Sequence, residues 1–223
     1  VIKHMDIPIK MCGIKRILIE IKISFLYFVS NMATTIFGAF NTVMVGTILN
    51  SSDVAFWSVC MQLIGAVQAL YTPITDSIYP QMIKTKNYNF IKRVELIFLP
   101  ILLGGCLFTF FMSDWILYIV AGEKYQMAAR TLRFLVPVLF LSFFSMLLGW
   151  PTLGAIGKAQ KVMFTTVAAA IFQVVGLLLL MISNKFDLLT IASLRSLTEL
   201  VLAGARKIYC EKYKREFWNG ENG

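Results

Sequence analysis

Charged residues are scarce in this chain of 223 residues. Asp, Glu, Lys and Arg make up only 15% of it, compared with about 25% in an ordinary soluble domain. Disordered segments and nucleic-acid-binding arms need dense charge and low hydrophobicity, so the composition excludes both classes. Because 58% of the residues are hydrophobic, a soluble fold of this size could not bury them. The composition therefore predicts an integral membrane protein.

Residues that build metal sites and catalytic centres are also rare. The single histidine, His4, lies near the N-terminus, and the four cysteines lack the spacing of a metal site. The sequence contains no Walker A glycine loop, nucleophile elbow or HExxH motif. We therefore expect no enzyme activity, no cofactor and no bound metal. A membrane-embedded enzyme of glycan or lipid synthesis is the weaker alternative.

Six apolar segments are long enough to cross a membrane, and helices satisfy their own backbone groups in lipid. We place the spans at about residues 23–50, 54–80, 95–113, 133–157, 162–184 and 188–206. The predicted fold class is an all-α integral membrane protein with six transmembrane helices in one lobe, residues 23–206. Residues 1–22 are expected to form a cytoplasmic linker with an amphipathic pattern, and residues 207–223 a cytoplasmic tail.

The basic residues alternate between the two sides of these spans. Five lie before the first span, four between spans two and three, two between spans four and five, and five after span six. The loops on the other side hold four. Because basic residues collect on the cytoplasmic side, this pattern predicts that both termini are cytoplasmic and that the net charge of +9 implies no nucleic-acid partner. Arg206 is counted here among the charges beyond the sixth span.

The most informative polar residues lie in the sixth span. Arg195 and Glu199 are four residues apart, so they share one face of a helix. Glu199 falls near the middle of the membrane, where charges are costly and usually face a bundle interior or a water-filled path. We interpret the pair as part of the lining of a transport path. The alternative is a self-neutralising pair that holds helices together.

Amides in the first two spans are interpreted as lining of the same path. Asn31 and Asn41 lie in the first span, and Gln62 and Gln68 in the second. Amides within a membrane need partners, so contacts between helices are the alternative role. Asp76, at the end of the second span, is a candidate gate or a solvated residue at the membrane interface.

Two arginines mark the side of the membrane opposite the termini. Arg130 and Arg133 enter the fourth span from residues 114–133, the longest loop expected on that side. Anchoring at the interface is their ordinary role. The alternative is attraction of an anionic head group.

Five stretches, taken in order, carry a resemblance to a known family. They are FLYFVSNMATTIFGAFN at 25–41, MVGTILNSSDVAFWSVCMQL at 44–63, YTPITDSIYPQM at 71–82, VAGEKYQMAARTLRFL at 120–135 and LGAIGKAQ at 153–160. They resemble the polysaccharide (O-antigen or lipid-linked oligosaccharide, Wzx-type) flippases of the multidrug/oligosaccharidyl-lipid/polysaccharide (MOP) exporter superfamily. The stretch LLTIASLRSLTEL at 188–200 departs from the family pattern at Arg195.

The resemblance implies one half of a two-lobe transporter, with the chain looking like the C-terminal six-helix lobe. Such a protein would move undecaprenyl-pyrophosphate-linked oligosaccharide across the bacterial cytoplasmic (inner) membrane by alternating access, for lipopolysaccharide and other polysaccharide biosynthesis. The implied partners are the lipid-linked oligosaccharide, membrane lipids, and an N-terminal lobe or a second copy. The alternatives are a drug/cation antiporter of the same superfamily, with Glu199 as its carboxylate, and a non-transporting fragment.

Overall fold

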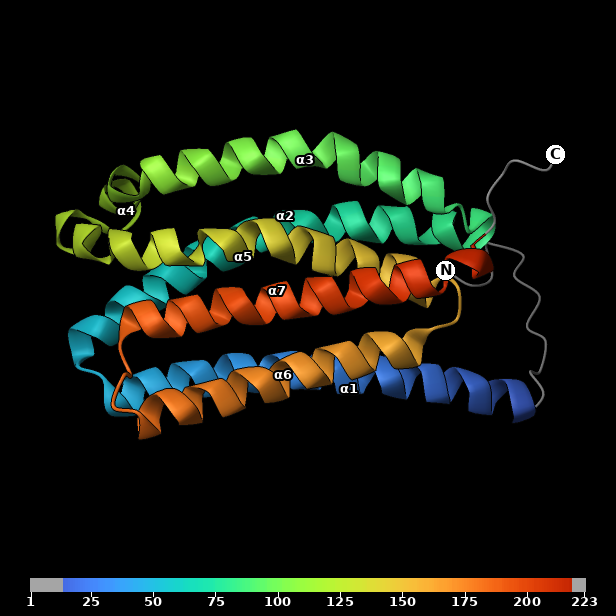
Figure 1. Cartoon of the computed structure of the whole chain (residues 1–223), viewed down its shortest axis with the longest axis horizontal. Coiled ribbons are helices and arrows are strands. Elements are labelled where there is room, and N and C mark those ends of the chain that lie inside the picture. The colour runs from blue at the N-terminus through green and yellow to red at the C-terminus, as the bar shows by residue number, and fades with distance from the viewer. Residues whose placement is uncertain (1–13, 218–223) are drawn as a thin grey trace, which may run out of the picture.

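The computed structural model describes residues 14–217, in which all regular elements are helices. Within this range six helical segments are long and apolar enough to cross a membrane. They are α1 (Ile14–Ile48), α2 (Ser51–Thr85), α3 (Tyr88–Phe111), α5 (Ala129–Leu147) with its flanking turns, α6 (Ala159–Ile182) and α7 (Leu188–Lys212) (Figure 1). The structure confirms the predicted all-α membrane fold.

Four shorter elements complete the described chain. They are α4 (Ser113–Ala121), the 3₁₀ turns η2 (Glu123–Ala128) and η4 (Lys214–Glu216), and the π-helical turn η3 (Leu148–Gly154). Residues 114–133, expected as a loop, are therefore mostly helical. The reason is that this stretch carries apolar side chains of its own, including Leu117, which is fully buried in a core cluster with Leu132.

The helices lie side by side, with α5 and α7 at the centre of the bundle. α1 packs on α6, α6 packs on α7, and α2 and α3 both pack on α5. All six long helices run along the long axis of the molecule (Figure 1). The contact between α6 and α7 is especially close, because a Cβ at Gly176 would lie 2.5 Å from the Cδ1 of Leu194. Glycine is therefore the residue that permits this approach.

Short polar signals begin the helices that follow tight turns. The side-chain oxygen of Asn50 caps α2, and that of Asn87 caps α3. Asp187 and Thr190 form a reciprocal capping box at the start of α7. Each cap satisfies backbone N–H groups that have no partner within the helix. These caps fix where the chain turns between neighbouring helices.

Several helices extend past the predicted spans, and two of them reach into the predicted linker and tail. α1 begins at Ile14, inside the predicted linker, and α7 continues to Lys212, beyond the predicted end at residue 206. Residues 1–13 of the linker and residues 218–223 of the tail lie outside the described part of the chain. Because Lys and Arg are good helix formers, a cluster of charges marks the edge of the membrane without ending a helix.

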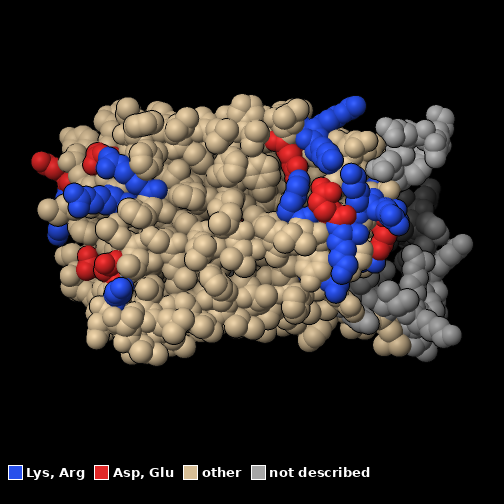
Figure 2. Space-filling model, in the orientation of Figure 1, with Lys and Arg blue, Asp and Glu red and all other residues tan. Residues whose placement is uncertain are grey.

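Charged side chains gather at the two ends of the bundle, and the face in Figure 2 has a broad uncharged band between them. We call the end with Lys84, Lys158 and Lys212 the basic end, and the end with Arg130 and Arg133 the arginine end. Many large apolar side chains are exposed along the bundle between them. An exposed apolar surface of this extent belongs in lipid. The chain is therefore a multi-pass membrane protein.

Candidate functional site

A polar cavity of about 460 Å³ lies among α1, α2, α5 and α7. Four of the six residues predicted to line a path are in its wall: Asn41, Gln68, Arg195 and Glu199. The rest of the wall includes threonine and serine hydroxyls from three of these helices. Polar groups from separate parts of the sequence thus meet in one hollow of an otherwise apolar bundle.

Arg195 and Glu199 form a buried ion pair in the wall of this cavity. The Nη1 of Arg195 lies 2.7 Å from the Oε2 of Glu199, and the two residues are 7% and 5% exposed. The other carboxylate oxygen of Glu199 accepts a hydrogen bond of 2.7 Å from the Oγ of Ser145 on α5. The pair therefore neutralises itself and joins α7 to α5, while its side chains also line the cavity.

Arg206 is a third buried charge in the cavity wall. Its guanidinium donates to the carbonyl of Ser145 on α5 and, on α6, to the hydroxyls of Thr166 at 2.8 Å and Thr165 at 3.4 Å. The hydroxyl of Ser30 on α1 donates in turn to Thr166 at 3.0 Å. This one side chain thus connects α7 to both of its neighbours, and through Thr166 to α1.

The assignment of Arg206 to the charges beyond the sixth span was wrong. Arg206 lies inside α7 and is only 7% exposed. It comes eleven residues after Arg195, which is close to three full helical turns and puts both side chains on one face. The spacing of Arg195, Glu199 and Arg206 was a usable signal, but the charge count treated a basic residue near the span end as part of the loop.

A kink within η3, just after the end of α5, makes room for Arg206. The turn is interrupted at Gly149, whose ψ is −114°, and a Cβ there would lie 2.8 Å from the Nη1 of Arg206. Pro151 has no N–H to give to the carbonyl of Leu147. The hydroxyl of Thr152 donates to that carbonyl instead, at 2.7 Å. The kink is therefore stabilised locally and shaped around the arginine.

A second polar network crosses the bundle beside the charges. Gln173 on α6 is fully buried, and its amide donates to the Oδ1 of Asn41 on α1 at 2.7 Å. The Oε1 of Gln173 accepts from the hydroxyl of Thr198 on α7 at 2.5 Å. Sequence reasoning missed Gln173, although a single amide within an apolar span was a sign of a buried partner. Asn41 therefore serves both roles weighed for it, as cavity wall and as helix contact.

Asn31, Gln62 and Asp76 lie outside the cavity wall and are exposed. Asn31 is one turn before Thr34, and Asp76 is one turn after Thr72, so both continue rows of cavity residues along α1 and α2. Gln62 does not continue such a row. Which side of a helix faces the bundle is decided by packing, and the presence of an amide does not reveal it.

The charges of the cavity sum to +1, because Arg195 and Arg206 outnumber Glu199 and its described wall holds no other Asp, Glu, Lys or Arg. Such a site favours an anion, while the surrounding hydroxyls and amides suit uncharged polar groups. Among residues 14–217, no group of three or more His, Cys, Asp and Glu could hold a metal ion. His4 lies outside the described residues.

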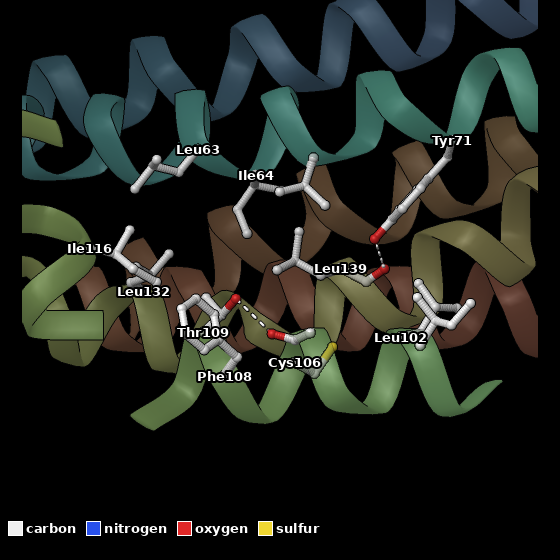
Figure 3. A pocket seen from close by; sticks show the side chains of 13 residues that line it. Leu63, Ile64, Tyr71, Leu102, Cys106, Phe108, Thr109, Ile116, Leu132 and Leu139 are labelled. Atoms are coloured by element: carbon white, nitrogen blue, oxygen red, sulfur yellow. Dashed lines mark hydrogen bonds between the residues drawn. The ribbon is translucent and has the colours of Figure 1, made fainter. Parts of the chain in front are cut away.

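A different cavity, of about 480 Å³, lies among α2, α3, α4 and α5 and is apolar (Figure 3). Leucine, isoleucine and aromatic side chains form its walls. The hydroxyl of Tyr71 donates to the carbonyl of Leu139 at 3.1 Å, so it is already satisfied. This cavity offers room for hydrocarbon and no charge for a polar ligand, so it is a weaker candidate for a substrate path than the cavity around Arg206.

The fold and the polar cavity around Arg206 together define a class of protein: multi-pass membrane proteins with a polar cavity of net positive charge. Within it, residues 8–86 match the family model described as "Polysaccharide biosynthesis protein". A Shigella dysenteriae protein named "Putative O-antigen transporter" is 23% identical over 129 residues, which are 56% of this chain and 33% of that protein. The matched region thus spans about a third of the length of that curated relative. No solved structure matches the chain.

Both matches confirm the predicted resemblance to the polysaccharide flippase family. The description of the family names polysaccharide biosynthesis, and the name of the Shigella dysenteriae relative describes that protein as a putative O-antigen transporter. The match to the family model, residues 8–86, includes all of α1 and all of α2 and ends before α5 and α7. These two helices supply the side of the cavity that faces the charges on α7.

Proposed function

We propose that this chain forms one six-helix lobe, resembling the C-terminal one, of a flippase for undecaprenyl-pyrophosphate-linked oligosaccharide. The lobe would act in the bacterial cytoplasmic membrane by alternating access, and its polar cavity would form part of the substrate path. The observation that carries the proposal is a partly open cavity whose wall holds three buried charges, with a net charge of +1, among six apolar helices. Such a hollow is costly to build in a membrane unless a polar substrate uses it.

The charged groups of the cavity suit a pyrophosphate. Arg195 and Arg206 would bind its oxygens, because a guanidinium makes strong, charge-assisted hydrogen bonds to phosphate. Glu199 would hold Arg195 in position through their 2.7 Å contact. The amide of Gln68 and the hydroxyl of Thr72 would contact sugar hydroxyls. The undecaprenyl chain would stay in the surrounding lipid.

A second lobe would complete the path. Asn31 and Asp76 continue the rows of cavity residues on α1 and α2 but are exposed in this chain. Exposed polar groups at these positions are expected to face an N-terminal lobe or a second copy rather than lipid. Asp76 would then lie near the mouth of the path, where a gate is expected.

The geometry favours an anionic substrate over the cation of an antiporter. Cation coupling needs a buried carboxylate that is free to bind a proton or metal ion. Glu199 already accepts hydrogen bonds from Arg195 and Ser145. The net positive charge of the wall also repels cations.

Replacing Arg195 by glutamine in the intact gene is expected to make cells accumulate lipid-linked repeat units and lose surface polysaccharide. The change removes one of two charges available to the pyrophosphate, so transport should fall by about tenfold or more. Extracted lipids and surface glycan would be measured together. Lys185→Gln, a change at an exposed site on the arginine end, is the control and should behave as wild type. Drug sensitivity with a normal glycan would contradict the flippase proposal and favour the antiporter.

Cysteine labelling of intact cells tests the proposed orientation. Ser51 is the first residue of the 35-residue helix α2, and Asn89 lies in the first turn of α3, which begins at the other end of α2; both residues are exposed. In a chain whose native cysteines are replaced, a membrane-impermeant maleimide should react with Ser51→Cys and not with Asn89→Cys. Asn89 is preferred over Asn87, since Asn87 caps α3. The reverse labelling pattern would invert the proposed topology.

A further inference from the structure

A groove of about 570 Å³ follows the side of the α5–α7 pair that faces away from the polar cavity. Its apolar wall comes from both helices and the end of α3: Phe110, Phe134, Pro137, Leu141, Leu197 and Leu200. The polar cavity uses other residues of the same two helices, such as Ser145 and Glu199. The two hollows are therefore separated by the most closely packed helix pair of the bundle.

The hydroxyls in the groove are already satisfied. The Oγ of Ser196 donates to the carbonyl of Phe134 at 2.6 Å, and that of Ser193 donates to the carbonyl of Leu189 at 2.7 Å. The first of these bonds also ties α7 to α5 along the groove. The part of the groove formed by these residues is therefore suited to hydrocarbon, and it has no free hydroxyl donor for a sugar.

Two arginines stand at one end of the groove. Arg133 donates to Asp114 on α4 and, through its Nε, to the carbonyl of Phe110 at 3.2 Å. Arg130 is exposed and has no ion-pair or hydrogen-bond partner within residues 14–217. Both lie in the first two turns of α5, where the first turn holds no acidic residue and the helix dipole is also positive. This end of the groove therefore carries uncompensated positive charge.

Aromatic residues place these arginines at the level of lipid head groups. Trp115 and Tyr118 on α4 are 57% and 50% exposed, and Trp115 follows the aspartate that pairs with Arg133. Exposed Trp and Tyr collect at the membrane–water interface. Leu141 lies eight residues beyond Arg133, or about 12 Å deeper along α5. The groove thus leads from the interface into the hydrocarbon.

We propose that this groove is a binding site for an anionic phospholipid. Its phosphate would contact Arg130 and Arg133, and an acyl chain would lie between α5 and α7. Charge complementarity favours an anionic over a zwitterionic lipid. The position of the groove, away from the polar cavity and without groups for sugars, favours a phospholipid over the transported carrier. The site is independent of the proposed transport function.

Lipid retention by the purified chain in detergent tests this site. Native mass spectrometry would follow the chain with equal amounts of phosphatidylglycerol and phosphatidylcholine that carry identical acyl chains. We expect preferential retention of phosphatidylglycerol. In Arg130→Gln/Arg133→Gln, this preference over phosphatidylcholine should fall by about fivefold for each arginine removed. Lys124→Gln/Lys185→Gln removes the same charge from the same end and should keep the preference. Equal retention of the two lipids, or an unchanged preference in the arginine variant, would overturn the proposal.

A second variant tests the apolar part of the groove with both arginines in place. Leu200→Trp at a 51% exposed position fills the groove, and it should reduce phosphatidylglycerol retention while circular dichroism stays unchanged. Retention equal to wild type would show that the acyl chain lies elsewhere and would overturn the proposal. Preferential retention of undecaprenyl phosphate over phosphatidylglycerol would assign the groove to the carrier and would also overturn it.

Discussion

Arg206→Ala is expected to lower the free energy of unfolding by about 3 kcal/mol, because it leaves buried partners without their donor. The carbonyl of Ser145 and the hydroxyls of Thr165 and Thr166 all accept from this guanidinium. Water cannot replace these bonds freely inside a membrane bundle. Thermal or denaturant unfolding in detergent, followed by circular dichroism, would measure the loss.

The neighbouring residue provides a matched control. Lys207 pairs with Glu95 at 2.8 Å, but its side chain is 42% exposed, so Lys207→Ala should cost under about 1 kcal/mol. A double-mutant cycle adds a sharper test, since a Cβ at Gly149 collides with the guanidinium of Arg206. Gly149→Ala should therefore destabilise the wild type more than it destabilises Arg206→Ala. Equal unfolding temperatures for Arg206→Ala and Lys207→Ala would contradict the assigned role.

Glu199→Ala is expected to destabilise the bundle by about 3–5 kcal/mol, the usual cost of removing one partner from a buried ion pair. Arg195 would keep its charge at a site only 7% exposed, and the hydroxyl of Ser145 would keep only the carbonyl of Ser142, at 3.0 Å, as its acceptor. Unfolding in detergent would again provide the measurement.

Removing both charges should be much less harmful than removing one. Arg195→Met/Glu199→Leu fills the same space with apolar side chains and leaves no unpaired charge, so its unfolding free energy should stay close to wild type. A double variant as unstable as Glu199→Ala would show that the pair itself stabilises the fold. The expected result would instead provide a folded chain that lacks one of the two proposed pyrophosphate contacts.

The fold class could be predicted from the sequence, because the lipid environment directly constrains the amino-acid composition of each span. A span must be apolar over its length, and the chain satisfies this six times within the described residues. The buried pair of Arg195 and Glu199 was accessible for the same reason, since charges four apart within an apolar span stand out. Hydropathy and spacing together therefore identified the bundle and the pair at the centre of its polar cavity.

The remaining parts of the site depended on packing. Arg206 lies close to the basic end, so its position in the sequence is also that of a loop residue. Only the length of α7 and the kink at Gly149 show that its side chain lies inside the bundle. The pairing of Gln173 with Asn41 joins residues 132 positions apart. Exposed amides such as Asn31 and Gln62 differ from Asn41 only in which side of the helix they occupy. A single sequence holds little information about such contacts.

Binding of a polyprenyl pyrophosphate to the purified chain tests the central claim most directly. Titration should show binding that weakens with added salt, and at least about tenfold weaker binding to Arg195→Met/Glu199→Leu than to wild type. The corresponding polyprenol, which lacks the pyrophosphate, should bind both proteins weakly and equally. Equal affinity of the two proteins for the pyrophosphate, or equal affinity of the wild type for pyrophosphate and polyprenol, would contradict the assignment of the polar cavity as an anion-binding substrate path.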